Sequence, residues 1–392
     1  MSDVGALLTL EYGTALPAEL RSGYGFPVFG SNGEVGRHRE FHVAEPGIIV
    51  GRKGSVGKVT WSDEPFWPID TTYWVKCSSG DQRWVYWLLT WLPLARLDSS
   101  TGVPGLNRND VYALPVVLPT AIERKKVAQI LDTLDTAIHE TEAIIAKLKL
   151  VKQGLLYDLL TRGIDANGEL RPPQSEAPHL YKESPLGWVP REWEVPLLDS
   201  VAVRGSGHTP SKNVPSYWNG GIKWVSLADS HRLDHIYISE TENEISALGI
   251  ANSSAVLHYA GTVIISRDAG VGKSAVLASN MAVSQHFMAW RCSERLNNLY
   301  LYFYLQRDKP KFEAIALGST IKTIGLPFFR DYMVAMPSRA EQDQIVSSLT
   351  AAEQSVSQSL ADAAKFREFK CGLMDDLLTG RIRVTPLLEP AE

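Results

Sequence analysis

The sequence has 392 residues, 44% of them hydrophobic, and a formal net charge of −5. A chain of this length is longer than one hydrophobic core ordinarily supports, so we expect two or more domains. The net negative charge argues against a protein that coats nucleic acid regardless of sequence, but it is compatible with local basic patches. The cysteines Cys77, Cys292 and Cys371 lie far apart, the N-terminus lacks a signal-peptide pattern, and the longest apolar run is too short for a bilayer. These features predict a reduced, cytoplasmic protein without a membrane segment.

Residues 1–118 are expected to form a first mixed α/β domain. They contain short β-rich runs such as "PGIIVGRKG" and "TTYWVKC", separated by turn residues. One aromatic-rich stretch, "QRWVYWLLTWLPLA", has the length and composition of a buried helix.

Residues 119–163 are predicted to form one long helix. Their apolar residues recur at alternating steps of four and three, which is the heptad pattern of a coiled coil with a narrow apolar seam. The predicted seam residues here are Val127, Leu131, Leu134, Ile138, Ile145 and Leu148. Residues 164–190 are rich in proline and polar side chains, so they are interpreted as an exposed linker.

The chain then repeats itself. Residues 191–336 are predicted to form a second mixed domain, residues 337–382 a second long helix, and residues 383–392 a tail. Glu341 and Lys370 of the second helix match Glu123 and Lys152 of the first. The seam residues of the second helix are Ile345, Leu349, Val356 and Phe366.

Only the other helix offers a matching seam within the chain, so the two helices are expected to pair. If two similar domains are attached symmetrically, that pairing is antiparallel. The predicted fold class is therefore α+β, with two mixed α/β domains separated by two long antiparallel coiled-coil helices and with the pseudo-twofold symmetry of an internal duplication. A generic dimerisation coiled coil is the alternative.

A glycine-rich stretch, "GRKGSVGK" at residues 51–58, occurs again as "SRDAGVGK" at residues 266–273. It looks like a nucleotide loop, but a Walker A sequence requires glycine where this chain has Arg52 and Arg267. We therefore interpret both stretches as hairpin turns with outward cations. An ordinary hairpin explains the glycines, though it explains the paired cations less well.

Other candidate sites have simpler interpretations. The pairs His38/His42 and His231/His235 have the spacing of metal ligands but no evident third ligand, so no metal site is predicted. The sequence contains no methyltransferase motif and no helicase-type acidic box, so no catalytic site is predicted either. Trp218 is interpreted, like Trp224, as a core anchor rather than a platform for stacking bases.

With these residues in view, the sequence resembles the specificity (S) subunit of type I restriction–modification systems. The resemblance covers essentially the whole chain. It rests on the ordered, duplicated motifs "LPTAIERKKVAQIL" and "MPSRAEQDQIVSSL", "LLYDLLTRGI" and "LMDDLLTGRI", together with "TPSKNVPSYWNGGIKWVSL" and "PFWPIDTTYWV". The first helix departs slightly, with "IER" where the second has "AEQ".

The resemblance implies a non-catalytic chain that recognises DNA. Each mixed domain would be a target-recognition domain for one half of a split double-stranded DNA site, and the helices would span the unread spacer and dock two methyltransferase subunits. Restriction/translocase subunits would complete the complex, with S-adenosylmethionine and ATP/Mg bound by those partners and no cofactor in this chain. Because the two domains differ in sequence, an asymmetric bipartite site is expected.

The residues predicted to lie near DNA are Arg52, Lys53, Lys58, Arg108, Arg267, Lys273 and Lys322. Two rival classes remain, a nucleotide-hydrolysing enzyme and a coiled-coil scaffold or adaptor without sequence-specific DNA binding.

Overall fold

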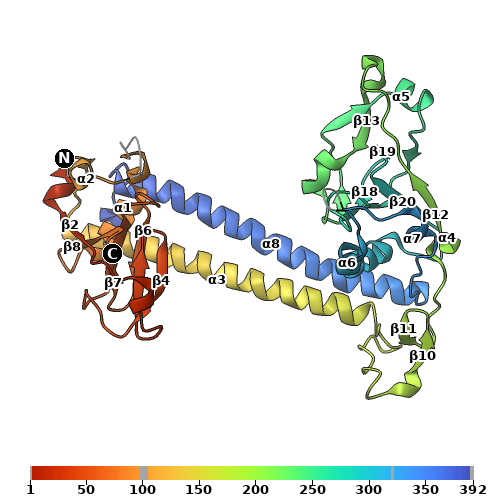
Figure 1. Ribbon diagram of the computed structural model, residues 1–392, viewed down its shortest axis with the longest axis horizontal. Helices are drawn as coiled ribbons and strands as arrows, with labels where there is room; N and C mark the ends of the chain where they lie inside the picture. Colours follow the sequence, from red (N-terminus) through yellow and green to blue (C-terminus); the bar gives the residue numbers. More distant parts are fainter. Residues whose placement is uncertain (1, 98–104, 319–321, 389–392) are drawn as a thin grey trace. The chain divides into compact units, whose positions relative to one another are not determined.

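The computed structural model describes residues 2–97, 105–318 and 322–388 (Figure 1). The chain divides into two compact units. Unit 1 comprises Met1–Ile144 and Ser359–Glu392, and unit 2 comprises Ile145–Gln358. The divisions fall inside the two long helices, so each unit contains part of both helices as well as its own sheets.

In unit 1, two sheets and an aromatic helix form the mixed domain. A four-stranded antiparallel sheet has the order β2 (Leu8–Tyr12), β8 (Thr72–Cys77), β5 (Gly47–Gly51), β6 (Val59–Ser62). A second sheet has the order β4 (Gly33–His38), β3 (Phe26–Gly30), β7 (Trp67–Pro68). A short pair joins β1 (Ser2–Asp3) to β9 (Pro115–Val116).

The aromatic helix α1 (Gln82–Trp91) packs against β5 and β6. Its Trp84 and Trp87 are buried in a core that also includes residues from both long helices. Arg83 and the indole nitrogen of Trp87 both hydrogen-bond to Asp132, which anchors the domain to the first long helix. The short helix α2 (Arg108–Tyr112) follows.

Unit 2 has larger sheets of the same general kind. One has the order β12 (Ala202–Ser206), β20 (Phe287–Cys292), β17 (Val263–Ser266), β18 (Ser274–Leu277), β14 (Tyr237–Ile238). The other has the order β15 (Asn243–Ile245), β13 (Trp218–Val225), β19 (Met281–Val283), β16 (Leu257–His258). Helix α6 (Asn298–Ile315) packs on β17 and β18. The short helices of this unit are α4 (Leu198–Val201), α5 (Ala247–Ala251) and α7 (Leu326–Arg330).

The two long helices are α3 (Ala121–Leu159) and α8 (Arg339–Leu378). In unit 1 the ammonium of Lys370 pairs with Asp135, and in unit 2 that of Lys152 pairs with Glu353. Within unit 1, Asp135 pairs with Lys370, and Glu142, further along α3, pairs with Arg367, which comes earlier in α8, so the two helices are antiparallel. This arrangement of two sheet-rich domains with two long helices confirms the predicted fold class.

The predicted helix-pairing seam is mostly out of solvent. Val127, Leu131, Ile138, Ile145, Ile345, Leu349 and Val356 are buried, whereas Leu134, Leu148 and Phe366 are partly exposed. Two lysines, Lys152 and Lys370, also lie in the seam, where each forms an ion pair with a carboxylate of the other helix. The two pairs occupy equivalent positions of the duplication, since Asp135 corresponds to Glu353 as Lys152 corresponds to Lys370.

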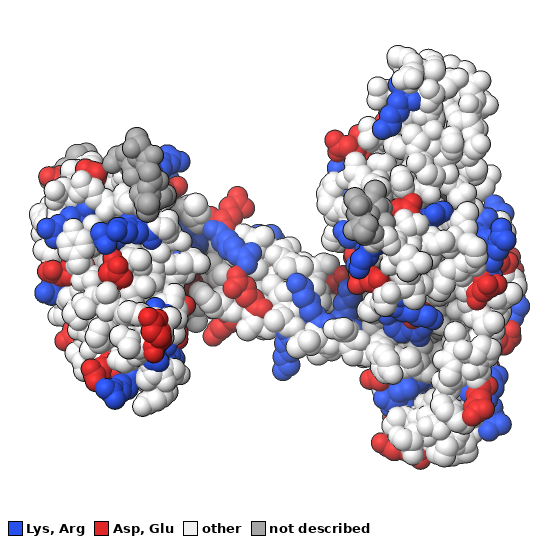
Figure 2. All heavy atoms as spheres, viewed as in Figure 1, with Lys and Arg blue, Asp and Glu red and all other residues white. Residues whose placement is uncertain are grey.

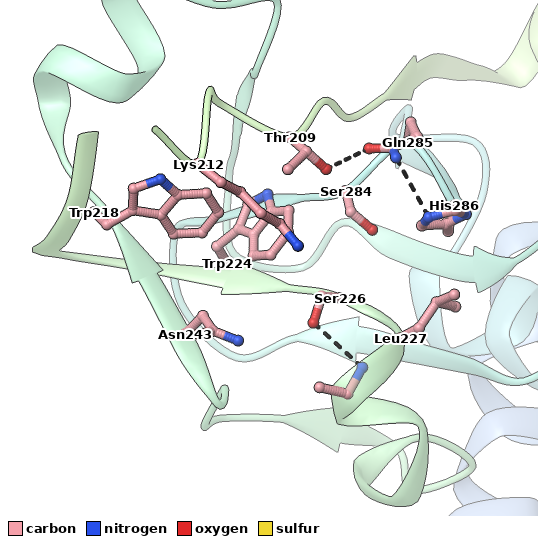
Figure 3. Close-up of a pocket in the computed structure, with 11 residues that line it drawn as sticks. Thr209, Lys212, Trp218, Trp224, Ser226, Leu227, Asn243, Ser284, Gln285 and His286 are labelled. Atoms are coloured by element: carbon pink, nitrogen blue, oxygen red, sulfur yellow. Dashed lines mark hydrogen bonds between the residues drawn. The ribbon is translucent and has the colours of Figure 1, made fainter. Parts of the chain in front are cut away.

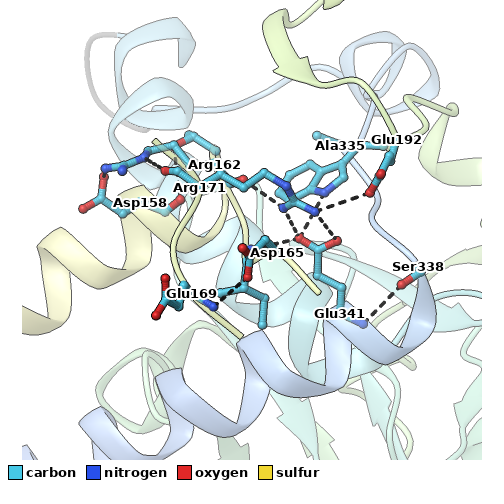
Figure 4. A network of polar contacts seen from close by, with 12 residues as sticks. Asp158, Arg162, Asp165, Glu169, Arg171, Glu192, Ala335, Ser338 and Glu341 are labelled. Carbon is cyan, nitrogen blue, oxygen red and sulfur yellow. Dashed lines mark hydrogen bonds and ion pairs between the residues drawn. The ribbon is translucent and has the colours of Figure 1, made fainter. Parts of the chain in front are cut away.

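Each long helix begins with a carboxylate that receives an arginine from the segment following the other helix. In unit 1, Glu123 accepts hydrogen bonds from Arg383 Nε at 2.8 Å and Nη2 at 2.7 Å. In unit 2, the carboxylate of Glu341 accepts from Arg171 Nη1 at 2.5 Å and Nη2 at 3.2 Å, and from the indole nitrogen of Trp193 at 3.2 Å (Figure 4). Glu123 and Glu341, which match in the internal repeat, therefore form equivalent ion pairs with Arg383 and Arg171. These two ion pairs are called the clasps.

The expectation of an exposed linker at residues 164–190 is wrong in part. The segment contains a hairpin of β10 (Tyr181–Ser184) and β11 (Gly187–Pro190). Tyr181 and Val189 are buried there, and Arg171 is 8% exposed. The segment is folded because its apolar side chains Ile164 and Val189 reach the core of unit 2. The other predicted domain boundaries stay predictions.

Among the described residues, no helix combines the length and apolar character needed to cross a membrane.

Candidate nucleic-acid interface

The two glycine-rich stretches form the same hairpin in the two units. In unit 1 the amide of Gly51 donates to Lys58 O at 2.8 Å, and that of Gly57 donates to Gly51 O at 2.8 Å. In unit 2 the amide of Ser266 donates to Lys273 O at 2.8 Å, and that of Gly272 to Ser266 O at 2.9 Å. A strand follows each turn, β6 in one and β18 in the other. A phosphate loop of a nucleotide-binding enzyme is followed by a helix whose N-terminus faces the phosphates, so this geometry is a different one.

The last glycine of each hairpin, Gly57 in unit 1 and Gly272 in unit 2, is required by its backbone. Gly57 has φ of +73° and Gly272 has φ of +84°, values that residues with a side chain rarely adopt. A Cβ atom on Gly57 would lie 2.6 Å from the backbone nitrogen of Ala95, and one on Gly272 would lie 2.9 Å from Cγ of Lys309. The glycines therefore let each hairpin approach the segment beside it.

In unit 1, two of the residues predicted to lie near DNA meet at one aromatic ring. The guanidinium carbons of Arg52 and Arg108 each lie 5.2 Å from the ring centroid of Tyr12. Arg52 also donates to the backbone oxygen of Asp70 through Nη2 at 2.6 Å. Tyr12 is 49% exposed, so this pair of cations is placed at the surface. Sequence reasoning missed Tyr12, because a single tyrosine in a strand carries no distinguishing pattern.

The ring of Tyr73 lies beside that of Tyr12, with the two ring centroids 5.1 Å apart. Burial, with a hydrogen bond to Tyr12, raises the pKa of Tyr73 to about 12. Its hydroxyl donates to Leu106 O at 2.9 Å, and the Leu106 amide donates to Arg52 O at 2.8 Å. The segment that leads to Arg108 is thereby tied to the hairpin.

The two hairpin lysines of unit 1 differ from each other. Lys58 Nζ donates to the backbone and side-chain oxygens of Asn32 at 2.8 and 2.9 Å, so it braces the hairpin while remaining exposed. The Lys53 side chain is exposed, and its backbone forms a bridge with Gly105.

In unit 2, Arg267 is partly buried and lies beside an acidic residue. Its side chain is 20% exposed, and Nε lies 3.6 Å from the carboxylate of Asp268. Asp268 is 8% exposed and accepts from Thr323 Oγ1 at 2.6 Å. The Ile324 amide donates to Arg267 O at 3.0 Å, which repeats the contact of Leu106 with Arg52.

Two other predicted residues of unit 2, Lys273 and Lys322, line one hollow of about 440 Å³ together with Lys309 and Glu313. Lys273 Nζ donates to Ser230 O at 2.9 Å, and Lys309 Nζ pairs with Asp234 at 2.5 Å. Lys273 and Lys322 form no ion pair among the described residues, and their positive charges favour an anion such as a phosphate. Lys309 was missed because a single lysine in an aromatic-rich helix carries no distinguishing pattern.

The basic side chains are local features of a mixed surface. On the face shown in Figure 2, Lys and Arg are interspersed with Asp and Glu. Among the described residues, no group of three or more His, Cys, Asp or Glu side chains is arranged to hold a metal ion.

A family model described as the type I restriction modification DNA specificity domain matches residues 1–150 and 190–360. The chain belongs to this family. Each matched range contains one mixed domain and a large part of one long helix, so the specificity-domain match follows the internal duplication.

Among curated proteins, this specificity-domain chain is similar to two specificity subunits of Methanocaldococcus jannaschii. The type I restriction enzyme MjaIX specificity subunit is 27% identical over 173 residues, covering 43% of this chain and 40% of the relative. The putative type I restriction enzyme MjaX specificity subunit is 24% identical over 282 residues, covering 71% and 62%. The chain thus spans less than two thirds of the length of these two relatives. The EcoR124I/EcoR124II specificity subunit of Escherichia coli is 22% identical, covering 76% and 70%.

Two solved structures share the fold. The S subunit of a type I restriction–modification system from M. genitalium superposes with a TM-score of 0.63 at 14% identity, covering 96% of this chain and 95% of that one. A chain from a study of complex assembly and conformational transition of the type I R-M system gives 0.56 at 16% identity, covering 97% of each chain.

Proposed function

We propose that this chain is the DNA sequence-recognition subunit of a type I restriction–modification complex. The observation that carries the proposal is the duplicated match to a DNA specificity domain, in which both copies present the same hairpin and place cations beside it. Each unit would read one half of a split double-stranded DNA site through side chains at base edges, and the cations would hold the phosphates.

The differences between the units support an asymmetric bipartite site. Unit 1 places Arg52 and Arg108 on Tyr12, whereas unit 2 surrounds a hollow with Lys273, Lys309 and Lys322. Two surfaces of different shape and chemistry are suited to different base sequences.

In this proposal the chain itself is not catalytic. Methyltransferase subunits would dock on the outward faces of α3 and α8, and restriction/translocase subunits would join them. S-adenosylmethionine and ATP/Mg would be bound by those partners. A coiled-coil scaffold without sequence-specific binding is less well supported. The apolar seam of α3 packs against that of α8 within the chain, so the helices do not need a second coiled-coil protein to cover it.

The proposal is tested by mapping methylated adenines across the host genome with the gene present, deleted and restored. We expect deletion to remove methylation at one split motif and the restored gene to return it. Unchanged methylation in a host that expresses both this chain and its methyltransferase would contradict the proposal. A purified complex that binds all DNA sequences equally would instead favour the scaffold.

A further inference from the structure

Unit 2 contains a second cavity, of about 390 Å³, that the proposed phosphate contacts do not use (Figure 3). It lies beside β13 and the turn between β19 and β20. Its walls include Trp218, Trp224, Lys212, Asn243, Ser284 and Gln285.

Two indoles form a rigid aromatic corner of this cavity. The rings of Trp218 and Trp224 are 5.2 Å apart at 89°. Both indole nitrogens are occupied, since Trp218 Nε1 donates to Ser211 O and Trp224 Nε1 donates to His208 O, each at 3.1 Å. The corner therefore offers flat apolar surface rather than hydrogen bonds, which suits a planar ring.

The polar lining is incomplete without a ligand. Ser284 is 1% exposed, and its Oγ has no hydrogen-bond partner among the described residues, although a buried hydroxyl ordinarily has one. Figure 3 shows this oxygen directed into the cavity, with the Lys212 ammonium and the Asn243 amide nitrogen also directed there. Lys212 forms no ion pair with the described residues. A ligand with both donors and acceptors along one edge would satisfy this set.

A chain of hydrogen bonds joins the cavity to the glycine-rich hairpin. Thr209 Oγ1 lies 2.5 Å from Gln285 Oε1, and Gln285 Nε2 lies 3.3 Å from His286 Nε2. His286 Nδ1 in turn lies 2.8 Å from Asp268 Oδ2, in the hairpin. The next two hairpin residues, Ala269 and Gly270, line the lysine hollow. The hairpin thus links an aromatic, hydrogen-bonding cavity to a site suited to phosphate.

We infer that the cavity between Trp218 and Trp224 receives one nucleobase of the half-site read by unit 2, with Lys212, Asn243 and Ser284 contacting its polar edge. This inference rests on the proposed function and adds the residues that choose a base. A nucleobase turned out of the duplex combines a planar face for the indoles with donors and acceptors on its edge, and its phosphate neighbours would meet Lys273, Lys309 and Lys322. Trp218 is then more than a core anchor.

The test uses the assembled complex with full-length variants and a DNA library in which each base of the split site is randomised. We expect Lys212→Ala, Asn243→Ala and Ser284→Ala to lower affinity for the preferred site by about ten-fold and to relax the preference at one base position. That position should lie in the half-site of unit 2, while the preferences in the other half-site stay as in the wild type. Lys182→Ala, on the β10–β11 hairpin, is the matched control for loss of a lysine.

The outcomes separate this inference from the function on which it rests. A wild-type complex with no base preference at all would contradict the proposed function. A selective wild-type complex whose three variants keep every preference would overturn the cavity assignment alone. The assignment also fails if the variants alter binding of free nucleoside monophosphates but leave DNA preferences intact.

Discussion

At the scale of single residues, the hairpins show how one sequence pattern can support very different chemistry. A glycine-rich loop binds nucleotide phosphates when a helix follows it and its backbone amides converge. Here Arg52 and Arg267 stand where that loop needs glycine, and strands follow. The remaining glycines serve the turn and its close packing instead.

This role of the glycines predicts a stability effect. Gly57→Ala and Gly272→Ala should each destabilise the chain by about 1–3 kcal/mol, because the side chain meets both an unfavourable φ and a close neighbour. Gly154→Ala is the contrasting variant, since Gly154 lies inside α3 with open space around it, and it should stabilise by about 0.5–1 kcal/mol. Chemical denaturation measures all three, and equal effects would contradict the explanation.

The arginine pair on Tyr12 predicts coupled effects on DNA. Arg52→Ala and Arg108→Ala should each weaken binding to the half-site of unit 1 by about ten-fold and reduce the salt dependence, without changing the other half-site. Because both cations contact one ring, the double variant should lose less than the sum. Titrations over a range of salt concentrations, with each half-site scrambled in turn, check this, and strictly additive losses would argue against a shared platform.

At the scale of secondary-structure elements, charges in the seam set the register of α3 and α8. Lys152 and Lys370 are partly buried, and each is neutralised by a carboxylate of the opposite helix. Displacing one helix along the other would separate both pairs at once. The seam lysines therefore favour one antiparallel register at some cost in stability.

Charge reversal tests this pairing. Lys152→Glu should destabilise by about 1–3 kcal/mol, because it places two carboxylates together, and adding Glu353→Lys should restore most of the loss. The same exchange at Lys370 and Asp135 should restore less, since Lys370 Nζ also lies 4.3 Å from the ring centroid of Trp87. Thermal denaturation of the single and double variants gives the comparison, and no rescue at either pair would rule out this register.

The start of α3 predicts a pH dependence. Hydrogen bonds from Arg383 and Thr385 lower the pKa of Glu123 to about 2, from an ordinary value of 4.5. Since the folded-state pKa is depressed, the contribution to stability is present above pH 4.5 and is lost as the pH falls toward 2. Glu123→Gln should flatten the fall in melting temperature over this interval, whereas Glu140→Gln on the exposed face should not. Parallel curves for Glu123→Gln and wild type would disprove this role.

At the scale of the whole molecule, the duplication is visible in the ion pair at the start of each long helix. Arg171 follows the first long helix and binds the start of the second, and Arg383 follows the second and binds the start of the first. The arginines of the two ion pairs differ in burial, because the Arg171 side chain is 9% exposed and that of Arg383 is 56% exposed. Both carboxylates are buried, with the Glu341 side chain 11% and the Glu123 side chain 3% exposed.

The difference predicts unequal consequences. Arg171→Ala leaves the buried carboxylate of Glu341 without its charge partner and should destabilise unit 2 by about 3–5 kcal/mol. Adding Glu341→Gln should recover part of this, because the remaining group is neutral. Arg383→Ala should have a smaller effect on unit 1, because water can reach the place of that exposed arginine and Glu123 keeps its hydrogen bonds from Thr120 and Thr385. Hydrogen exchange resolves the two units separately, and a larger effect in unit 1 would contradict the comparison.

The sequence alone predicted much of this protein because duplication leaves a strong pattern. The heptads of the two helices, the repeated hairpin and the failure of both copies to match a nucleotide loop are all local or periodic features. These are sufficient to predict two mixed domains and two paired helices. The residues expected near DNA follow from them, and their contact with DNA stays a prediction.

Tertiary structure alone decided which distant residues meet. The pairing of Arg52 and Arg108 on Tyr12, the clasp of Arg171 with Glu341 and the folding of the supposed linker join segments that no sequence period connects. The cavity beside Trp218 likewise depends on four chain segments, around residues 209–212, 218–228, 243 and 284–286, that come together only in the folded chain. Periodicity reports which side of an element is apolar, whereas these contacts depend on packing between elements, and a local sequence pattern does not encode them.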